Sequence, residues 1–381
     1  MNYIFGDSRN EEIAYYRDFA EKKLRPYVRQ MDVEEKTSAH IILRLKECGL
    51  LGIPMDKKYG GAGKDFVSAT ICMEELSKVS PAVAGIINVT SELATDGIRV
   101  FGTKEQRAKY VPQLASGDKI GAFAITEAGA GSDTAAVKTT AVLDGDHYVI
   151  NGSKIFITNA ELSGIFLIGA QTGLPDGKRK LSMFIVEKEF PGFAIGKHEK
   201  KMGIRASSTC ELILEDCIVP KENLLGELGK GQKIALICLD GGRVMIAAQA
   251  LGIAQGAIDE TISYLKANAA QTDDLINKQG VQFKLADLQT RTDAARLMVY
   301  RAAILWDQKK NFSREAAMAK LYASEIANEV SRECVQIMGY EGCTTDYLVE
   351  SMMRDAKITE IYEGTNEIQR LVIAGLMGLK A

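Results

Sequence analysis

The sequence changes its hydrophobic period twice, and this change limits the possible folds more than any other feature. Up to about residue 118, apolar residues recur at spacings of three and four, which is typical of amphipathic helices. The middle of the chain consists of short β-type runs, and the helical spacing then returns and holds to the end. We therefore expect an α+β protein of three domains, namely a helical N-terminal domain (1–118), a β middle domain (119–225) and a C-terminal helical bundle (226–381).

The expected elements follow from the same patterns. The β-type runs are rich in Ile, Val, Phe and Thr and are separated by turn residues; they are 121–126, 147–160, 164–172, 180–196 and 208–220. The Asp144-Gly145 pair predicts a tight hairpin. The later helical segments are long enough to form a four-helix bundle; they are 231–268, 280–308, 313–338 and 366–378. Near the start, Pro26 is expected to interrupt the first helix.

Composition excludes several classes of function. Lys and Arg number 47 against 50 Asp and Glu, so there is no overall basic field to attract nucleic acid. The seven cysteines include no Cys-x-x-Cys pair, and there are only three histidines. A structural zinc site, a disulfide framework and Ser-His catalysis are therefore not expected, and we expect no metal.

Neither a membrane span nor an export signal is expected. The first 24 residues lack a basic segment followed by an apolar run, and they are too acidic for a transit peptide. The longest apolar stretch, 244–258, carries Gln249 and Gln255 and is shorter than the roughly 20 residues of a membrane span. We expect a buried helix there and a cytoplasmic protein.

Three short segments offer candidate binding residues. In "AITEAGAGSD" (124–133), Gly129 and Gly131 allow backbone N–H groups to approach an anion or a cofactor, although a simple surface turn is the commoner interpretation. "IFITNA" (155–160) would place Phe156 and Thr158 on one face of a strand, which also fits an ordinary half-buried strand. In "LDGGRV" (239–244), Arg243 stands among small residues at the expected start of an apolar helix, where a surface charge is the alternative.

The segment "RDAKITEIYEGTNEIQR" (354–370) places Glu363 between Tyr362 and Gly364, where one helical pattern ends and another begins. Most glutamates near helix ends are solvated or capping groups, so these residues alone favour no catalytic role. Asn366 with Gln369 three residues later resembles a capping arrangement for the next helix.

The order and spacing of these segments resemble the acyl-CoA dehydrogenase family along essentially the whole chain, and most of all its short-chain, butyryl-CoA-type bacterial members. The residues that carry the resemblance are "KYGGAG", "TEAGAGSD", "NGSKIFITNA", "KMGIRASSTCELILEDCIVP", "LDGGRVMIAAQALGIAQGA", "FKLADLQ" and "MRDAKITEIYEGTNEIQRLVIAG". The resemblance implies a helical N-terminal domain, a β-barrel-like middle domain and a C-terminal four-helix bundle. It also implies FAD between the last two domains and a homotetramer.

The resemblance also implies the roles of individual residues. Glu363 would be the catalytic base that removes the α-proton of an acyl thioester while a hydride leaves the β-carbon for the flavin. Burial would raise its pKa, and Gly364 would let the backbone approach the thioester oxygen. The positions that match cofactor contacts are Phe123, Ile125, Thr126, Ser132, Phe156, Ile157, Thr158, Gln336, Gly339, Thr365 and Glu367. Those that match substrate contacts are Ser132, Asp240, Arg243 and Gly364.

Two places depart from the family pattern. Where relatives have an arginine and then Phe-Gly, this chain has Asn268, Gln271 and Thr272. That arginine reaches the FAD pyrophosphate of a neighbouring subunit. Where relatives show Gly-Gly-x-Gly-Tyr, the chain keeps the glycines of "GYEGC" (339–343) but brings in Tyr340, Glu341 and Cys343. Both departures fall at the ADP end of the cofactor.

The resemblance implies FAD-dependent α,β-dehydrogenation of a short-chain acyl-CoA, or enoyl-CoA reduction in reverse, with an electron-transferring flavoprotein as electron partner. The departures leave a second interpretation open. In it, the chain has lost FAD and acts in non-redox thioester chemistry or as a subunit of a larger redox complex.

Overall fold

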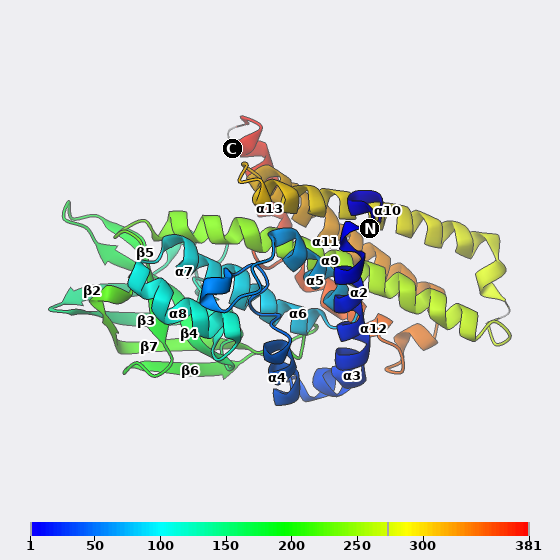
Figure 1. Ribbon diagram of the computed structural model, residues 1–381, viewed down its shortest axis with the longest axis horizontal. Coiled ribbons are helices and arrows are strands. Elements are labelled where there is room, and N and C mark those ends of the chain that lie inside the picture. Colours follow the sequence, from blue (N-terminus) through cyan, green and yellow to red (C-terminus); the bar gives the residue numbers. More distant parts are fainter. Residues whose placement is uncertain (1, 273, 380–381) are drawn as a thin grey trace.

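The computed structural model describes residues 2–272 and 274–379. The molecule is elongated, with its β-strands at one end and long helices reaching to the other (Figure 1). The order helical, β, helical along the chain confirms the predicted fold class.

The N-terminal part is a group of short helices. Their bounds are α1 (Asn2–Phe5), α2 (Asn10–Phe19), α3 (Arg25–Glu34), α4 (Ala39–Glu47), α5 (Phe66–Ser77), α6 (Pro81–Asn88), α7 (Asp96–Phe101) and α8 (Lys104–Ser116). The first helical run is interrupted as predicted, because Pro26 lies in the first turn of α3 after a π-helical segment, η2 (Ala20–Leu24). A second π-helical segment, η4 (Val89–Thr95), joins α6 to α7.

The middle part is one twisted sheet of eight strands. The strands are β1 (Ile120–Ala124), β2 (Thr140–Asp144), β3 (His147–Thr158), β4 (Ser163–Gly173), β5 (Arg179–Glu187), β6 (Phe193–His198), β7 (Thr209–Pro220) and β8 (Leu224–Leu225). Their order in space is β6-β7-β3-β2-β4-β5-β8, and β1 pairs with β4 in parallel. The predicted hairpin joins β2 to β3, with Gly145 at a φ of +61°.

The C-terminal part contains three long helices and two shorter ones. They are α9 (Gly231–Ala267), α10 (Gln279–Asp307), α11 (Ser313–Met338), α12 (Val349–Ile358) and α13 (Asn366–Leu376). Helix α12 was not among the four long segments expected, and it is the helical pattern that ends before Glu363. By length and composition α9 is apolar enough to cross a membrane, but 78% of its most apolar window is buried inside the protein, as in the core helix of a soluble domain.

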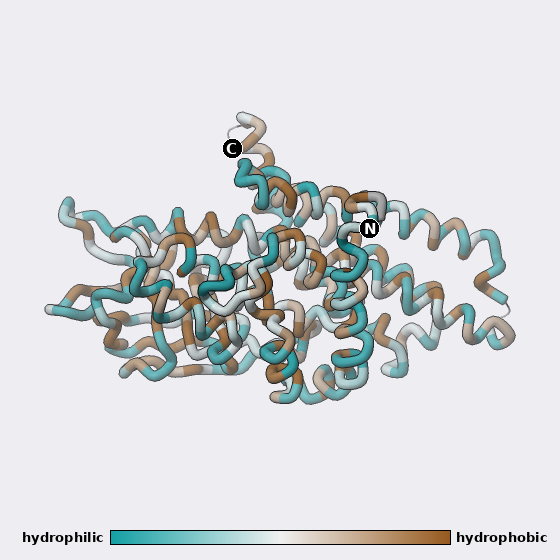
Figure 2. Tube along the Cα trace, viewed as in Figure 1, coloured by the Kyte–Doolittle hydropathy of each residue, from teal (hydrophilic) through white to brown (hydrophobic). Residues whose placement is uncertain are grey.

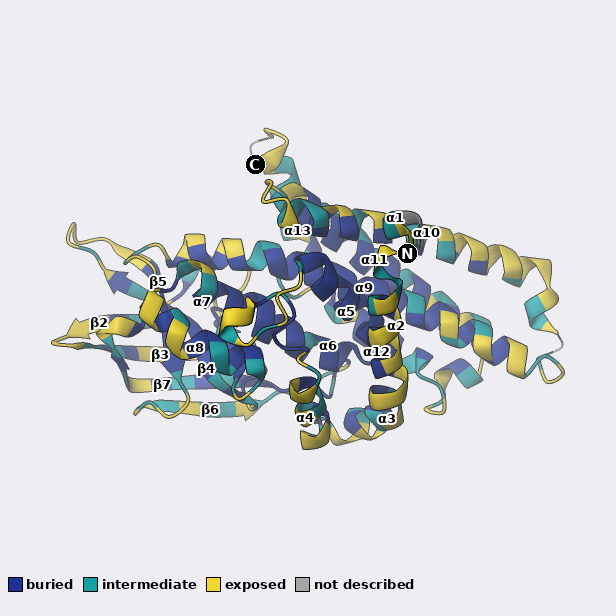
Figure 3. Ribbon diagram, in the orientation of Figure 1, coloured by how far each residue is buried: buried dark blue, intermediate teal, exposed yellow. Residues whose placement is uncertain are grey.

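Helices α5 and α9 pack against each other at the centre of the molecule, and every residue of α5 is buried (Figure 3). Hydrophilic residues dominate outer helices such as α2 and α3 (Figure 2). Gly252 of α9 allows the close approach of α5, because a Cβ built there would lie 2.6 Å from the Cβ of Ser77. The core thus fixes α9 against the N-terminal helices, and this places the candidate site described below.

The close packing of α5 on α9 yields a stability prediction. We expect Gly252→Ala to destabilise the fold by about 1–3 kcal/mol, because the added methyl group must force two buried helices apart. Gly375→Ala is the matched control, since a Cβ built at that helical glycine meets nothing within 4 Å. Urea unfolding followed by circular dichroism measures both, and equal midpoints for the two variants would contradict the packing argument.

Candidate active site

The candidate base, Glu363, lies in the tight turn between α12 and α13. Glu363 has a φ of +50° and Gly364 a φ of +93°, so two successive residues adopt the left-handed region. This conformation is uncommon for a residue with a side chain, and in native proteins it persists where the surroundings fix it. Thr365 then caps α13 by accepting a hydrogen bond from the N–H of Ile368.

Two buried side chains hold the turn by its carbonyl groups. Lys320 of α11 is fully buried, and its Nζ donates to the carbonyl oxygen of Gly364 at 2.8 Å and to Oδ1 of Asn366 at 3.0 Å. Nε2 of Gln369 donates to the same Gly364 carbonyl at 2.9 Å. The expectation that Asn366 and Gln369 cap the helix was therefore wrong: Thr365 is the cap, and these two amides anchor the turn.

The carboxylate of Glu363 is buried against α9 and held by one hydrogen bond. Nδ2 of Asn88, the last residue of α6, donates to Oε1 at 2.7 Å. Oε2 is buried without a hydrogen-bond partner in the described chain. A Cβ on Gly242 of α9 would collide with Oε2, so any larger residue there would force the carboxylate out of its present position.

Burial raises the pKa of Glu363 to about 7. The hydrogen bond from Asn88 and the positive charges of Lys320 and Arg243 act in the opposite direction but do not cancel the effect. Burial also lowers the pKa of Lys320, to about 8. A carboxyl group with a pKa near neutrality is poised to accept or release a proton.

The neighbouring Tyr362 ties the turn to the molecular core. Its hydroxyl group donates to Oε1 of Gln249 in α9, and Nε2 of Gln249 donates to the carbonyl oxygen of Pro81 at 2.7 Å. Elements from three parts of the chain thereby fix the orientation of the candidate base.

Arg243 and Asp240 form an ion pair on α9 near Glu363. Arg243 is only 4% exposed, and Asp240 also accepts from the hydroxyl group of Ser313 at 2.6 Å. The alternative of a surface charge at a helix start was wrong, because α9 begins at Gly231 and buries Arg243 in its interior.

Several buried polar atoms in this region have no partner within the described chain. They are Oε2 of Glu363, Oδ1 of Asn88, Nε of Arg243 and Oε1 of Gln369. Each buried polar group without a partner costs roughly 1–3 kcal/mol. A cluster of unpartnered polar atoms around one acid is therefore typical of a site that binds a polar ligand, such as a thioester.

The candidate flavin contacts gather at one end of the sheet. The backbone N–H of Ile155 donates to the carbonyl oxygen of Thr126 at 3.0 Å, which sets the end of β1 beside the end of β3. Phe156 is 61% exposed, and Thr126 and Thr158 are half-buried, as is Phe123. An exposed ring beside hydroxyl groups fits the planar, polar-edged ring system of a flavin.

The expected regular strand at Phe156 was wrong in detail. The register shifts between Lys154 and Ile157, and Phe156 has a φ of +57°, so a bulge turns its ring outward. The side chains of Ile125 and Ile157 are buried in the core, so only their backbone groups remain to face a cofactor.

A buried ion pair fixes the glycine-rich turn beside Phe156. Nζ of Lys154 donates to Oε1 of Glu127 at 2.7 Å and to the carbonyl oxygen of Ile125 at 3.1 Å. Although burial acts to raise it, the hydrogen bonds from Lys154, from Thr139 and from the N–H groups of Lys138 and Thr139 lower the pKa of Glu127 to about 2. The turn is thus held by a charged anchor that sequence reasoning missed.

The structure does not bring all the predicted site residues together. Gln336 and Gly339 are exposed at the C-terminal end of α11, far along the molecule from the sheet (Figure 1). Ser132 and Glu367 are exposed as well, and Thr365 is half-buried beside Glu363. The single chain therefore assembles two groups of site residues, one around Glu363 and one around Phe156 with Thr126 and Thr158. It leaves Gln336, Gly339, Ser132 and Glu367 on its surface.

The residues that depart from the family pattern lie after the C-terminal ends of α9 and α11, and Gln336 lies in the last turn of α11. The rings of Tyr264 and Tyr347 contact each other at 5.0 Å between centroids, which joins the end of α9 to the segment after Gly339. Asn268 is the C-terminal cap residue of α9, and its Nδ2 donates to the carbonyl oxygen of Tyr264 at 3.0 Å. Tyr340 is 83% exposed.

Comparisons with known proteins place the chain in a family. Family models match it in three consecutive parts, as the acyl-CoA dehydrogenase N-terminal domain (residues 10–118), middle domain (122–217) and C-terminal domain (229–377). The short-chain specific acyl-CoA dehydrogenase of Clostridium acetobutylicum is 48% identical over 373 residues, 97% of this chain and 98% of that protein.

Solved structures agree with this assignment. The butyryl-CoA dehydrogenase of Megasphaera elsdenii has a TM-score of 0.93 and 42% identity, with 97% of each chain covered. A chain in a structure described as an electron transferring flavoprotein of Acidaminococcus fermentans has a TM-score of 0.92 and 44% identity, again with 97% of each chain covered. The chain belongs to the acyl-CoA dehydrogenase family, as its motifs had indicated.

Burial of Glu363 yields a pH-dependent stability prediction. Folding raises the pKa of this acid from 4.5 to about 7, so its contribution to stability is complete below pH 4.5 and is lost as the pH rises towards 7 and beyond. We expect Glu363→Gln to raise the free energy of unfolding at pH 8 by up to about 3 kcal/mol and to change it little at pH 4.5.

Thermal unfolding at the two pH values, without added ligand, measures this difference. Glu11→Gln, on the exposed face of α2, is the control and should leave both midpoints unchanged. A Glu363→Gln variant that shows the same pH dependence as the wild type would contradict the buried, high-pKa acid.

Proposed function

We propose that this protein removes one hydrogen from Cα and one from Cβ of a short-chain acyl-CoA thioester, or adds them to an enoyl-CoA in reverse, with FAD as its cofactor. Glu363 is the base. The observation that carries the proposal is the carboxylate of Glu363 itself, which has a pKa of about 7, one unpartnered oxygen and a position at the turn between α12 and α13, in a family of acyl-CoA dehydrogenases.

The turn geometry supports the second requirement, which is stabilisation of the enolate. A hydrogen α to a thioester becomes acidic only when negative charge on the carbonyl oxygen is stabilised. Within the described residues the N–H group of Glu363 donates no hydrogen bond, and it belongs to the same left-handed turn residue as the acid. This N–H group is available to the thioester oxygen while the carboxylate takes the α-proton.

The Phe156 cluster is where this chain would hold the flavin ring. Phe156 would cover the ring, and Thr126 and Thr158 would bond its polar edge. The ion pair of Lys154 and Glu127 would keep the contacting turn in place. Bound FAD supplies the acceptor for the hydride that leaves the β-carbon.

Arg243 and Asp240 would contact the thioester portion of the substrate together with Ser132 and Gly364. Arg243 supports this role because it is buried and its Nε lacks a partner within the described chain. Gln336, Gly339, Thr365 and Glu367 would reach FAD, and the exposed positions of Gln336 and Gly339 suit a contribution to the cofactor of a neighbouring copy.

We also propose a homotetramer that exchanges electrons with an electron-transferring flavoprotein in the cytoplasm. Exposed apolar residues on α10, on α13 and directly after α13 support an assembly of copies; they are Phe283, Leu297, Leu371, Leu376 and Met377. All seven cysteines are free thiols, which suits a reducing compartment.

The role of Glu363 is tested by its amide variant. We expect Glu363→Gln to keep its FAD but to lose anaerobic bleaching of the flavin by butyryl-CoA, with turnover reduced by at least about 100-fold because an amide accepts no proton. Flavin absorbance in a stopped-flow instrument measures both. Glu325→Gln, a surface acid paired with Arg370, should bleach like the wild type. Undiminished turnover of Glu363→Gln would defeat the assignment of the base.

The departures at the ADP end yield a gain-of-function prediction. We expect Asn268→Arg to tighten FAD binding about ten- to a hundredfold, because one charged hydrogen bond contributes roughly 1.5–3 kcal/mol. Flavin fluorescence during titration of the apoprotein measures the dissociation constant. Gln232→Arg, on an exposed face at the opposite end of α9, controls for the added charge. Equal affinities for both variants would contradict the proposal, and wild-type protein that takes up no FAD would favour the interpretation without a flavin.

A further inference from the structure

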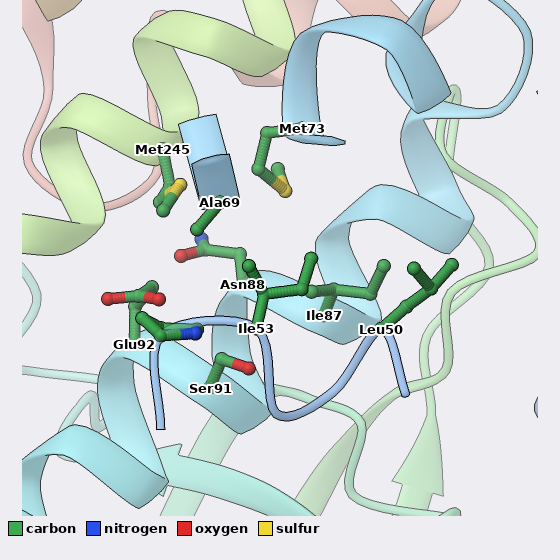
Figure 4. A pocket seen from close by; sticks show the side chains of 10 residues that line it. Leu50, Ile53, Ala69, Met73, Ile87, Asn88, Ser91, Glu92 and Met245 are labelled. Atoms are coloured by element: carbon green, nitrogen blue, oxygen red, sulfur yellow. The ribbon is translucent and has the colours of Figure 1, made fainter. Parts of the chain in front are cut away.

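A small cavity is lined by Asn88, the residue that donates a hydrogen bond to the candidate base Glu363, and by its neighbours (Figure 4). Its volume of about 10 Å³ admits one water-sized group. Most of its lining is apolar and includes Leu50, Ile53, Met73 and Met245. Its polar lining residues include Asn88 and Glu92.

Glu92 is an unusual residue for such a place. It is 3% exposed, and its Oε1 has no hydrogen-bond partner within the described chain. Arg99 does not neutralise it, because this arginine is paired with Asp96 through Nε at 2.7 Å and Nη2 at 2.5 Å. Oδ1 of Asn88 lacks a partner as well. Two unpartnered polar atoms thus belong to neighbouring residues that line one small cavity.

The surroundings of Glu92 favour its protonated form. Burial and then the repulsion from Asp96, Asp307 and Glu363 raise its pKa well above the ordinary value, and the attraction of Arg99 does not offset them. A protonated carboxyl group donates one hydrogen bond from O–H and accepts at its other oxygen. The amide oxygen of Asn88 only accepts. Together they offer one donor and one acceptor, which are the partners that a single hydroxyl group needs.

The π-helical segment η4 supports a role for these residues in binding. It begins directly after Asn88 and contains Glu92. A π-helical turn in an α-helix is rare and occurs frequently at functional sites. Leu93 of the same segment packs beside Gly242, where Oε2 of Glu363 lies, so η4 forms one wall of the space in front of the base.

We propose that this cavity is the closed end of the acyl pocket, and that Glu92 selects a short acyl thioester whose far end carries an uncharged hydroxyl group. The inference rests on the proposed function, since it takes the α-carbon to lie at Glu363. A terminal hydroxyl group that enters the cavity donates to Asn88 and accepts from Glu92. A methyl group in its place leaves both polar groups unpaired, and a carboxylate there is repelled by three neighbouring acids.

The test compares two thioesters of nearly equal size, 4-hydroxybutyryl-CoA and pentanoyl-CoA, on the FAD-loaded enzyme. We expect wild-type kcat/KM to be at least tenfold higher for the hydroxyl compound. Glu92→Leu should reverse this preference, and Glu92→Gln should keep most of it, because the amide still donates and accepts. Dissociation constants measured with Glu363→Gln, which binds without turnover, should show the same order of preference.

A wild-type preference for pentanoyl-CoA, or an unchanged ratio in Glu92→Leu, overturns the inference. Should Glu92→Leu not fold, the ratios of the wild type and of Glu92→Gln decide it. Oxidation of butyryl-CoA reports on the proposed function separately. If butyryl-CoA is oxidised while pentanoyl-CoA is preferred to the hydroxyl compound, only the role of Glu92 fails. If no thioester is oxidised, the proposed function fails.

Discussion

The buried carboxylate of Glu363 is the interaction on which the arrangement of this molecule depends. Its ionised form receives one hydrogen bond, from Asn88, and the nearby charges of Lys320 and Arg243, and this is less than water would supply. The result is an acid whose proton affinity lies near neutrality. Burial of this carboxylate is unfavourable, and the large apolar core around α5 and α9 supplies the stability that offsets it. The core holds the site rigid without contributing a reacting group.

The site exists only when distant parts of the chain are packed together. Asn88 and Glu363 are separated by 275 residues, and Lys320 reaches the Gly364 carbonyl from another helix. The turn that carries the base is left-handed at two successive residues, a conformation that side-chain donors from α11 and α13 keep in place. Such a base is pre-oriented, so ligand binding need not supply the energy that orders it.

The sequence predicted the elements of the fold better than the contacts of the site. The hydrophobic periodicity was sufficient to predict the change from helices to strands and back to helices, because each period reflects the burial of one face of the element. It missed Lys320 and Asn88, since a polar residue within an apolar run signals burial but does not name its partner. The start of α9 at Gly231 matches the expected segment 231–268, but Arg243 was interpreted as lying at a helix start, and the pattern did not show that its side chain is buried. The cap of α13 was placed on Asn366, one residue late, because Thr365 and Asn366 are both good capping residues.

Two regions of the molecule would affect different properties of the enzyme, namely cofactor binding in one and the choice of acyl chain in the other. Asn268 caps the C-terminal end of α9 and Tyr340 follows the end of α11, and the contact of Tyr264 with Tyr347 joins these two regions. Interactions there would act equally before and during the reaction, so their loss would change how much enzyme holds its cofactor and not the rate of the chemical step. Glu92 and Asn88, in contrast, line the space in front of the base. A change there alters which acyl chain fits, because a polar group buried without its partner is penalised in every complex that fails to pair it.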